Sequence, residues 1–141
     1  MLPKNRWKIT RNQIPVVNLL VPIFIGGVEG ASLVVLKKQG RLMLPGGYLE
    51  SGKDWQRVCL DVCRYEIRVR MEEGSRFWPI DCFTSTHKSV FALFAQSPSL
   101  REGDLLNWKK KSDERILLNP GDHQLAFDHH TEMVRRFFRI L

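Results

Sequence analysis

The residues with the clearest potential for chemistry form one continuous segment, a glycine-containing loop that runs into a helical stretch. The loop is Leu44-Pro45-Gly46-Gly47-Tyr48-Leu49-Glu50-Ser51-Gly52, and helical periodicity extends from about Lys53 to Val69. Glycines with positive φ let a ligand approach the backbone closely, and a glycine turn before a helix can present N–H groups to phosphate oxygens. The segment therefore predicts a phosphate-binding loop that includes Gly46 and Gly47.

One carboxylate, Glu66, lies on the apolar face of this predicted helix. At about 100° per residue, its neighbours on that face are Trp55, Val58, Cys59, Val62 and Val69. A lone carboxylate there is costly unless it is paired, protonated or bound to a metal. A side chain at the rim of the core could also reach water, so the position alone leaves a functional role and a packing role equally open.

The opposite face of the predicted helix is charged, and its members are Asp54, Arg57, Asp61, Arg64 and Arg68. The arginines could form an anion site. However, Asp61 lies four residues after Arg57 and three before Arg64, which is the spacing of ion pairs on a helix surface. We therefore interpret this face as exposed to solvent.

The loop and helix resemble the signature of the Nudix hydrolase superfamily, G-x5-E-x7-R-E-U-x-E-E-x-G-U, in which U is aliphatic. The usual L-P-G preface is present at Leu44–Gly46, and Gly47 takes the first position of the signature. Leu125–His130 also resembles the entry to the last helix of that family. The resemblance covers most of the chain and implies an α/β fold, a Nudix-like α/β/α sandwich with a mixed β-sheet between helices.

The signature is degenerate in this chain. Three of its four glutamates fall on Lys53, Val62 and Tyr65, and only the last glutamate, Glu66, is retained. Members of the family use such glutamates to hold Mg²⁺ or Mn²⁺, which neutralises the pyrophosphate of a nucleoside diphosphate derivative and activates water. The resemblance thus implies a depleted metal site.

Two further residues extend this candidate site. Glu50 is an extra carboxylate found in many members, and Glu66, Glu50 and the Gly46 carbonyl could together hold one Mg²⁺ or Mn²⁺ ion weakly. Glu66 would be the catalytic residue if the protein is active. Lys53 stands where the signature has a glutamate, so it could either replace part of a cation's charge beside phosphate or remain a solvated surface lysine.

Three functions are compatible with these residues. The first is a protein that binds a nucleoside diphosphate-type or other phosphorylated ligand with weak or no standard hydrolysis. The second is an active metal-dependent pyrophosphohydrolase that adds a later carboxylate, Glu102 or Asp104, to Glu66 and Glu50. The third is a nucleic-acid or protein interaction module, because Lys109–Lys111 follows Trp108 and the net charge is +7. We favour the first and regard a nucleic-acid partner as the weakest.

Composition sets the remaining expectations. The 141 residues suit a single domain over 1–141, with 43% hydrophobic and 26% charged residues. No apolar run reaches the roughly 18 residues of a membrane span, and the basic start (Lys4, Arg6, Lys8) leads to no cleavage site, so we expect no membrane partner and a cytoplasmic protein. We expect Cys59, Cys63 and Cys82 to be free thiols, the first two in the core rather than on a metal. From the family resemblance we also expect that the protein can form a homodimer.

The pattern of apolar residues predicts the order of elements. Strands are expected at Val16–Ile25, Ala31–Leu36, Arg41–Leu44, Phe77–Phe83, Ser89–Ala95 and Arg115–Leu118. Pro79 favours an edge position for the strand that contains it. A final helix is expected from Asp128, an N-cap, to Leu141. Of the histidines, His87 could face a pocket, His123 has no assigned role, and His129 and His130 are expected to cap or pack.

Overall fold

The computed structural model describes residues 15–50, 52–85 and 90–140. Its strands are β1 (Val16–Leu20), β2 (Pro22–Phe24), β3 (Ser32–Lys38), β4 (Arg41–Met43), β5 (Gly46–Tyr48), β6 (Trp78–Ser85), β7 (Val90–Gln96), β8 (Leu100–Arg101) and β9 (Asp113–Leu118). Its helices are α1 (Trp55–Asp61), the π-helix η2 (Val62–Glu66), the 3-10 helix η3 (Glu102–Asp104) and α2 (Asp128–Ile140). The expectations for Lys4, Arg6, Lys8, Ser51, His87, Ser89 and Leu141 concern residues outside these ranges.

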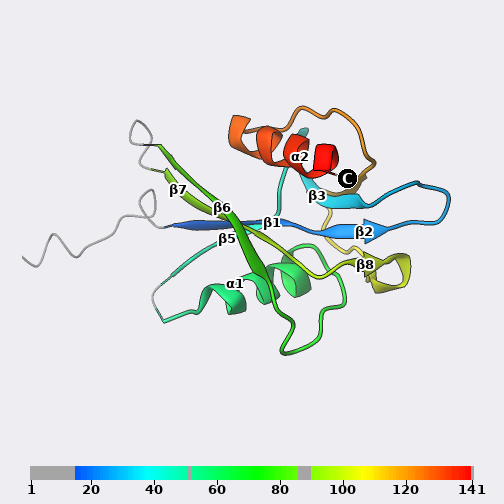
Figure 1. Cartoon of the computed structure of the whole chain (residues 1–141). Helices are drawn as coiled ribbons and strands as arrows, with labels where there is room; N and C mark the ends of the chain where they lie inside the picture. The colour runs from blue at the N-terminus through cyan, green and yellow to red at the C-terminus, as the bar shows by residue number, and fades with distance from the viewer. Residues whose placement is uncertain (1–14, 51, 86–89, 141) are drawn as a thin grey trace, which may run out of the picture.

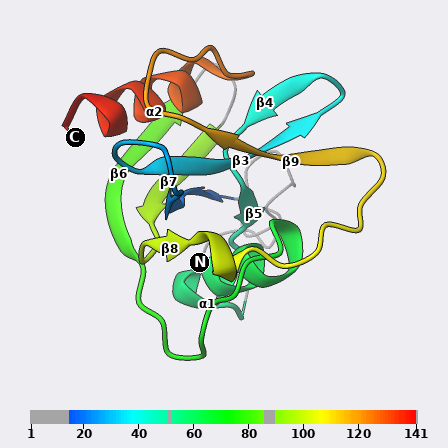
Figure 2. The same ribbon diagram turned by 90° about the vertical axis from the view of Figure 1, so that its right-hand side faces the viewer.

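The strands form two mixed sheets, whereas the sequence predicted one. The first has the order β5-β1-β7-β6, with β1 and β7 parallel, and the second has the order β4-β3-β2-β8, with β9 on β3. The strand predicted at Val16–Ile25 is split, because Val21 links β1 in the first sheet to β2 in the second. Figure 2 shows β9 beside β3, the central strand of the second sheet.

Two hydrophobic cores fill the opposite sides of these sheets, and Figure 1 shows α1 and α2 on opposite sides of the strands. Alternation along β3 serves both cores: Val34 and Leu36 pack in the core with α1, and Leu33 and Val35 pack in the core with α2. The result is an α/β fold with helices on both sides, so the predicted fold class is confirmed.

The helix predicted from Lys53 to Val69 is shorter in the structure. It begins at Trp55 after the N-cap Asp54 and ends in the π-helical turn at Glu66. Arg68 then has φ 56°, and its carbonyl accepts hydrogen bonds from the Leu106 N–H at 2.9 Å and from Arg115 Nη1 at 2.8 Å. Val69 continues as a bridge to Leu105. Pairing with this later segment therefore ends the helix before the predicted point.

The glycine loop is also different from the prediction, because Gly46 and Gly47 lie in strand β5 and have no positive φ. A Cβ at Gly46 would come within 2.6 Å of the Val17 carbonyl oxygen, and a Cβ at Gly47 within 3.3 Å of the Val58 and Val62 side chains. The glycines are required for close approach of β5 to β1 and to the helix, rather than for a turn.

The remaining elements follow the predicted pattern with shifted ends. The strands predicted at Arg41–Leu44, Phe77–Phe83, Ser89–Ala95 and Arg115–Leu118 correspond to β4, β6, β7 and β9. β6 is an edge strand with a register shift between Pro79 and Asp81, so the edge position expected from Pro79 is confirmed. In the described part of the chain, no helix is both long and apolar enough to cross a membrane.

Candidate functional site

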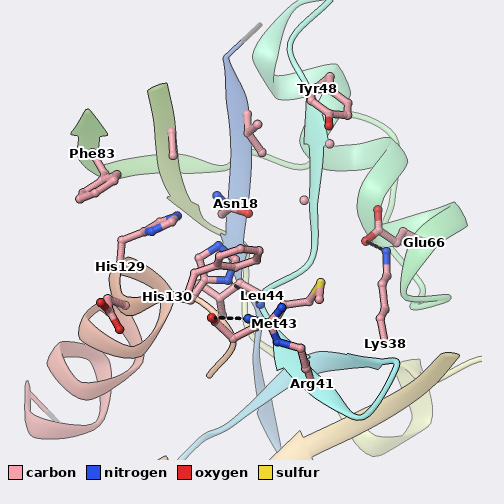
Figure 3. A pocket seen from close by; sticks show the side chains of 17 residues that line it. Asn18, Lys38, Arg41, Met43, Leu44, Tyr48, Glu66, Phe83, His129 and His130 are labelled. Carbon is pink, nitrogen blue, oxygen red and sulfur yellow. Dashed lines mark hydrogen bonds and ion pairs between the residues drawn. The ribbon is translucent and has the colours of Figure 1, made fainter. Parts of the chain in front are cut away.

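A cavity of about 890 Å³ opens where β1, β5 and the start of α2 meet. Figure 3 shows its two ends: Phe83 and His129 lie on one side, Lys38 and Glu66 lie on the other, and Asn18 lies between them. The volume falls within the range of about 300–1,000 Å³ that is usual for small-molecule sites. The segment Gly46–Tyr48 contributes to the wall, so the predicted loop does border a ligand-sized space.

Glu66 is paired with a lysine that the sequence prediction did not include. Lys38 Nζ is 3.7 Å from Glu66 Oε1, and Figure 3 shows the lysine extending from the end of β3 toward the carboxylate. Burial raises the pKa of Glu66, while the charge of Lys38 and a backbone hydrogen bond from Gly46 act in the opposite direction. The side chain is 23% exposed, so the carboxylate lies at the rim of the core and within the cavity wall.

A second, more open cavity of about 490 Å³ adjoins the first and shares Lys38, Gly47, Tyr48 and Glu66 with it. This second cavity is lined by the other predicted site residues, Glu50 and Lys53. Lys53 Nζ is 3.8 Å from Asp61 Oδ2, and its side chain is 52% exposed. The structure thus brings five predicted residues to two neighbouring cavities: Gly46, Gly47, Glu50, Lys53 and Glu66.

The later carboxylates suggested as metal ligands do not join this site. Glu102 Oε1 accepts a hydrogen bond from the Gly26 N–H, and Asp104 Oδ2 accepts one from the Arg101 N–H at 2.9 Å. Neither residue lines the two cavities that contain Glu66. Both are held in η3 beside β8, which corrects the prediction that one of them would complete the metal set. Among residues 15–50, 52–85 and 90–140, no cluster of three or more His, Cys, Asp or Glu side chains could hold a metal ion.

His130 connects α2 to the segment that leads into β5. Its Nδ1 accepts a hydrogen bond from the Leu44 N–H at 3.1 Å, so the neutral ring carries its proton on Nε2. Burial lowers the pKa of His130 to about 3, and the neighbouring His129 acts in the same direction. His130 is therefore a neutral structural acceptor at ordinary pH, in agreement with the predicted packing role.

Aromatic rings form the other end of the first cavity. The His129 ring stacks on Phe83 with centroids 4.4 Å apart and an interplanar angle of 5°. Phe127 is 43% exposed, and the Arg41 guanidinium lies over its ring at 5.7 Å. Arg41 also donates to the Ala126 carbonyl at 2.9 Å, the dashed line in Figure 3. This end is suited to contacts with a planar or apolar group.

The charged face of the predicted helix is occupied by internal ion pairs. Arg57 Nε is 3.1 Å from Asp61 Oδ1, and Glu73 pairs with Arg57 at 2.8 Å and with Arg64 at 3.0 Å. These arginines do not line the two cavities that contain Glu66. The expected pairing of Arg57 with Asp61 is confirmed, whereas Arg64 pairs with Glu73 and not with Asp61. The face is only partly exposed to solvent, because the side chains of Asp61 and Arg64 are each 26% exposed.

The surroundings of Cys59 and Cys63 favour packing in the core over binding of a metal ion by the two thiols. Cys59 and Cys63 are fully buried in the core with α1, and Cys82 is exposed. Burial raises the pKa of Cys59 to about 12 and raises that of Cys63 further. Protonated thiols are poor metal ligands, so the two residues behave as small apolar side chains.

Several cavity residues were absent from the prediction because they are remote in sequence from the loop. Asn18 comes from β1, Lys38 from β3, Phe83 from β6, and Phe127 precedes α2. Of these, Asn18 carried a signal, since it is a polar residue within an apolar run, and Phe127 lies in the segment Leu125–His130 that resembles the family. The others have ordinary positions in the sequence and become recognisable only when the strands are paired.

Comparison with known proteins finds solved structures with a similar fold, but it finds no family model or curated protein that matches. No protein-family model matches the chain, and no curated protein matches it significantly. A mutT/nudix family protein from Listeria innocua has TM-score 0.70 and 12% identity, covering 90% of this chain and 92% of that one. The NUDIX domain of Shewanella oneidensis NrtR, complexed with ADP ribose, has TM-score 0.70 and 11% identity, covering 99% and 94%.

A third similar structure is a C. elegans Ap4A hydrolase binary complex, with TM-score 0.61 and 12% identity, covering 90% of this chain and 96% of that one. All three similarities cover at least 90% of this chain and at least 90% of the other chain. The chain therefore has the fold of the Nudix superfamily, as the L-P-G-G segment predicted.

Proposed function

We propose that this protein binds a nucleoside diphosphate-type or other phosphorylated ligand beside Glu66, with weak or no standard hydrolysis. The observation that carries the proposal is the ion pair between Lys38 and Glu66 at 3.7 Å. A divalent cation bound to Glu66 would have to share that carboxylate with a lysine ammonium. Charge repulsion between the two cations disfavours this arrangement.

The donor set around Glu66 also fits a divalent ion poorly. Mg²⁺ requires near-octahedral oxygen ligation, whereas the groups close to this carboxylate include the Lys38 ammonium and a hydrogen-bonding Gly46 backbone group. Lys110 Nζ lies 3.3 Å from the Glu66 carbonyl oxygen and adds a second cation. The cations beside Glu66 are therefore the lysines of the protein itself.

The same lysines support a phosphorylated ligand. Lys38, Lys53 and Lys110 all line the second cavity, and Lys38 also lines the first. An ammonium is a compact charge that serves well as a phosphate partner. The complex of the Shewanella oneidensis domain with ADP ribose, and the name of the C. elegans Ap4A hydrolase, support the nucleoside diphosphate class within this fold.

The interaction-module alternative is weakened by the surroundings of Trp108. Its Nε1 donates to the Asp113 carbonyl at 2.8 Å, and its ring is contacted by Lys110 at 5.7 Å and by Arg115 at 5.5 Å. The indole also packs against the core with α1. A ring that is already occupied in this way offers little stacking surface to a nucleic-acid base.

Calorimetry separates binding from hydrolysis. We expect ADP and ADP-ribose to bind with the same affinity with and without Mg²⁺ or Mn²⁺. Lys38→Met should weaken binding about tenfold, equivalent to about 1.4 kcal/mol, and Lys109→Met, a change at an exposed lysine outside both cavities, should have no effect. Tight metal binding that Glu66→Gln abolishes, together with turnover above that variant, would instead establish the active hydrolase.

Two finer expectations remain proposals. A cytoplasmic location is consistent with three free cysteines, two of them buried, and fractionation of cells that express the chain would test it. The homodimer is tested by sedimentation equilibrium of the full chain, where a single species of 16.4 kDa would contradict it.

A further inference from the structure

Lys110 is a wall residue of the second cavity that comes from a segment remote from the glycine loop. It lies between η3 and β9, 44 residues after Glu66, and it is exposed. A free lysine side chain samples many rotamers, and it loses this freedom when it binds a ligand, which reduces affinity. A group that holds the lysine in place before the ligand arrives would therefore increase affinity.

Trp108 is such a group. Lys110 Nζ lies 5.7 Å from the centroid of the Trp108 ring and 3.3 Å from the Glu66 carbonyl oxygen. The face of an indole ring attracts an ammonium. The two contacts hold the ammonium beside the end of η2, where Lys110 lines the second cavity.

The Trp108 ring is itself fixed by the strand β9. Its Nε1 donates a hydrogen bond to the Asp113 carbonyl at 2.8 Å, and the Arg115 guanidinium lies 5.5 Å from its centroid. The same guanidinium donates to the carbonyls of Ile67 and Arg68 at 3.1 Å and 2.8 Å. Trp108 and Arg115 therefore connect a sheet strand to the end of the helix that carries Glu66.

The backbone at Arg68 supports this interpretation. With φ 56°, Arg68 adopts a left-handed conformation that is costly for a residue with a side chain, and its Nε is buried without a hydrogen-bond partner in the described part of the chain. Its carbonyl accepts the Leu106 N–H at 2.9 Å. Local strain persists where the surrounding contacts fix the backbone, so this turn indicates that the segment with Trp108 and Lys110 is held in one position.

We propose that Trp108 is a positioning residue for the phosphate site: its ring holds the Lys110 ammonium in the second cavity, where the ammonium and Lys38 bind the phosphate of the ligand. The inference rests on the proposed function, because it concerns the same ligand. Trp108 lines neither of the two cavities that contain Glu66. Loss of its ring should therefore weaken phosphate binding only through Lys110.

A double-mutant cycle tests this dependence, with the affinity of the full chain for inorganic pyrophosphate measured by calorimetry. Lys110→Met should lower the affinity about tenfold, as expected for one hydrogen bond to a charged group. Trp108→Leu should lower it about threefold. The double variant should bind no more weakly than Lys110→Met alone, because the ring acts through the lysine. Trp108→Phe keeps an aromatic face and should lose less affinity than Trp108→Leu.

Trp55→Leu is the matched control, because Trp55 is also partly buried against the core with α1 and lines neither cavity. It should lower the melting temperature and leave the affinity for pyrophosphate unchanged. A second measurement needs no leucine variant. In the parent chain, the indole ring should shift the NMR signal of the Lys110 ε-methylene protons upfield, and Lys110→Met identifies that signal by its loss.

Three results would overturn the inference. They are additive losses in the double variant, equal losses in the two Trp108 variants, and an unshifted Lys110 signal. If Lys38→Met weakens binding and Lys110→Met does not, or if ADP binds and pyrophosphate does not, the inference is wrong and the proposed function stands. If the parent chain binds neither ADP nor pyrophosphate, both proposals are wrong.

Discussion

Glu66 has 23% of its side chain exposed in the cavity wall, and the Lys38 ammonium lies 3.7 Å from its carboxylate. Two opposite effects act on this carboxylate. Burial favours the neutral form, and the charge of Lys38 favours the ionised form, with burial the larger effect because the pKa is raised. The Lys38 ammonium therefore offsets only part of the effect of burial on the ionised form of Glu66.

The sign of this pKa shift gives a prediction for Glu66→Gln. With the folded pKa above the ordinary value of 4.5, the folded state binds more protons than the unfolded state between the two values. Stability that Glu66 provides at low pH is thus lost as the pH rises through the folded pKa. Because glutamine cannot ionise, the stability of the variant should not decrease over this pH range. The variant should therefore melt at a higher temperature than the parent chain at pH 7.

Melting curves of the parent chain and the variant from pH 4 to pH 8 measure this effect, with Glu72→Gln as a control at an exposed loop carboxylate. A variant that melts lower at every pH would mean that the ion pair with Lys38 outweighs the burial of Glu66.

At the scale of elements, β5 depends on a close approach to β1. The backbone of Gly46 has no room for a side chain, since an added Cβ would lie 2.6 Å from the Val17 carbonyl oxygen and from Asn18 Oδ1. Backbone atoms cannot move aside without disturbing the pairing of Asn18 with Gly46. The two strands that border the cavity, β1 and β5, can therefore approach each other this closely only because Gly46 has no Cβ.

Gly46→Ala should destabilise the fold by about 1–3 kcal/mol, the usual cost of overpacking. Gly103→Ala is the control, because Gly103 has no positive φ and no atom within 4 Å of an added Cβ. Urea unfolding of both variants measures the difference. A loss at Gly46 no greater than that at Gly103 would contradict the close approach.

A second contact between elements joins α2 to the segment before β5 through His130 Nδ1 and the Leu44 N–H. Burial lowers the pKa of His130 from 6.5 to about 3. The unfolded state therefore binds more protons than the folded state between these values, and the stability contributed by neutral His130 is lost as the pH falls through this window. The limiting slope for one proton is about 1.4 kcal/mol per pH unit.

His130→Asn should keep an acceptor for the Leu44 N–H and remove most of this slope. His130→Leu should remove the slope as well, but it leaves the buried N–H without a partner and should cost about 1–3 kcal/mol at pH 7. Urea unfolding at pH 4, 5, 6 and 7 distinguishes the two variants. Equal stability of the two at pH 7 would show that the hydrogen bond contributes nothing.

At the scale of the whole molecule, the two cores on opposite sides of the sheets share β3. Leu36 is buried in the core with α1, and Met133 is buried in the core with α2. Because one strand contributes alternate residues to both cores, loss of packing on one side should lower the stability of the entire chain. This is also the test of the predicted single domain, 1–141.

Leu36→Ala and Met133→Ala should each lower the free energy of unfolding by about 2–5 kcal/mol. In the double variant the losses should add to within about 0.5 kcal/mol, because the residues lie in separate cores. Unfolding monitored by tryptophan fluorescence and by circular dichroism should show one coincident transition for each variant. Two separate transitions would mean that the cores unfold independently.

Local patterns in the sequence determined the kind of fold. The order of apolar segments predicted an α/β protein, the resemblance of the segment from Leu44 to the Nudix signature implied a Nudix-like form of it, and the fold has that form. Periodicity also placed Glu66 on the apolar side of its helix, where burial now raises its pKa. These features depend on neighbours within about four residues, so they can be recognised in one sequence.

Only the tertiary structure decided which side chains share the site. The ends of the helix depend on pairing between Val69 and Leu105, and the partner of Glu66 comes from the end of β3. Asn18 faces the cavity because β5 pairs with β1 in a register that places Gly46 beside it. Register between distant strands is a long-range property, since a shift of one residue would turn every side chain to the other face. For this reason the sequence alone identified the glycines, Glu50, Lys53 and Glu66, and the fold supplied Lys38, Asn18 and the aromatic rings beside them.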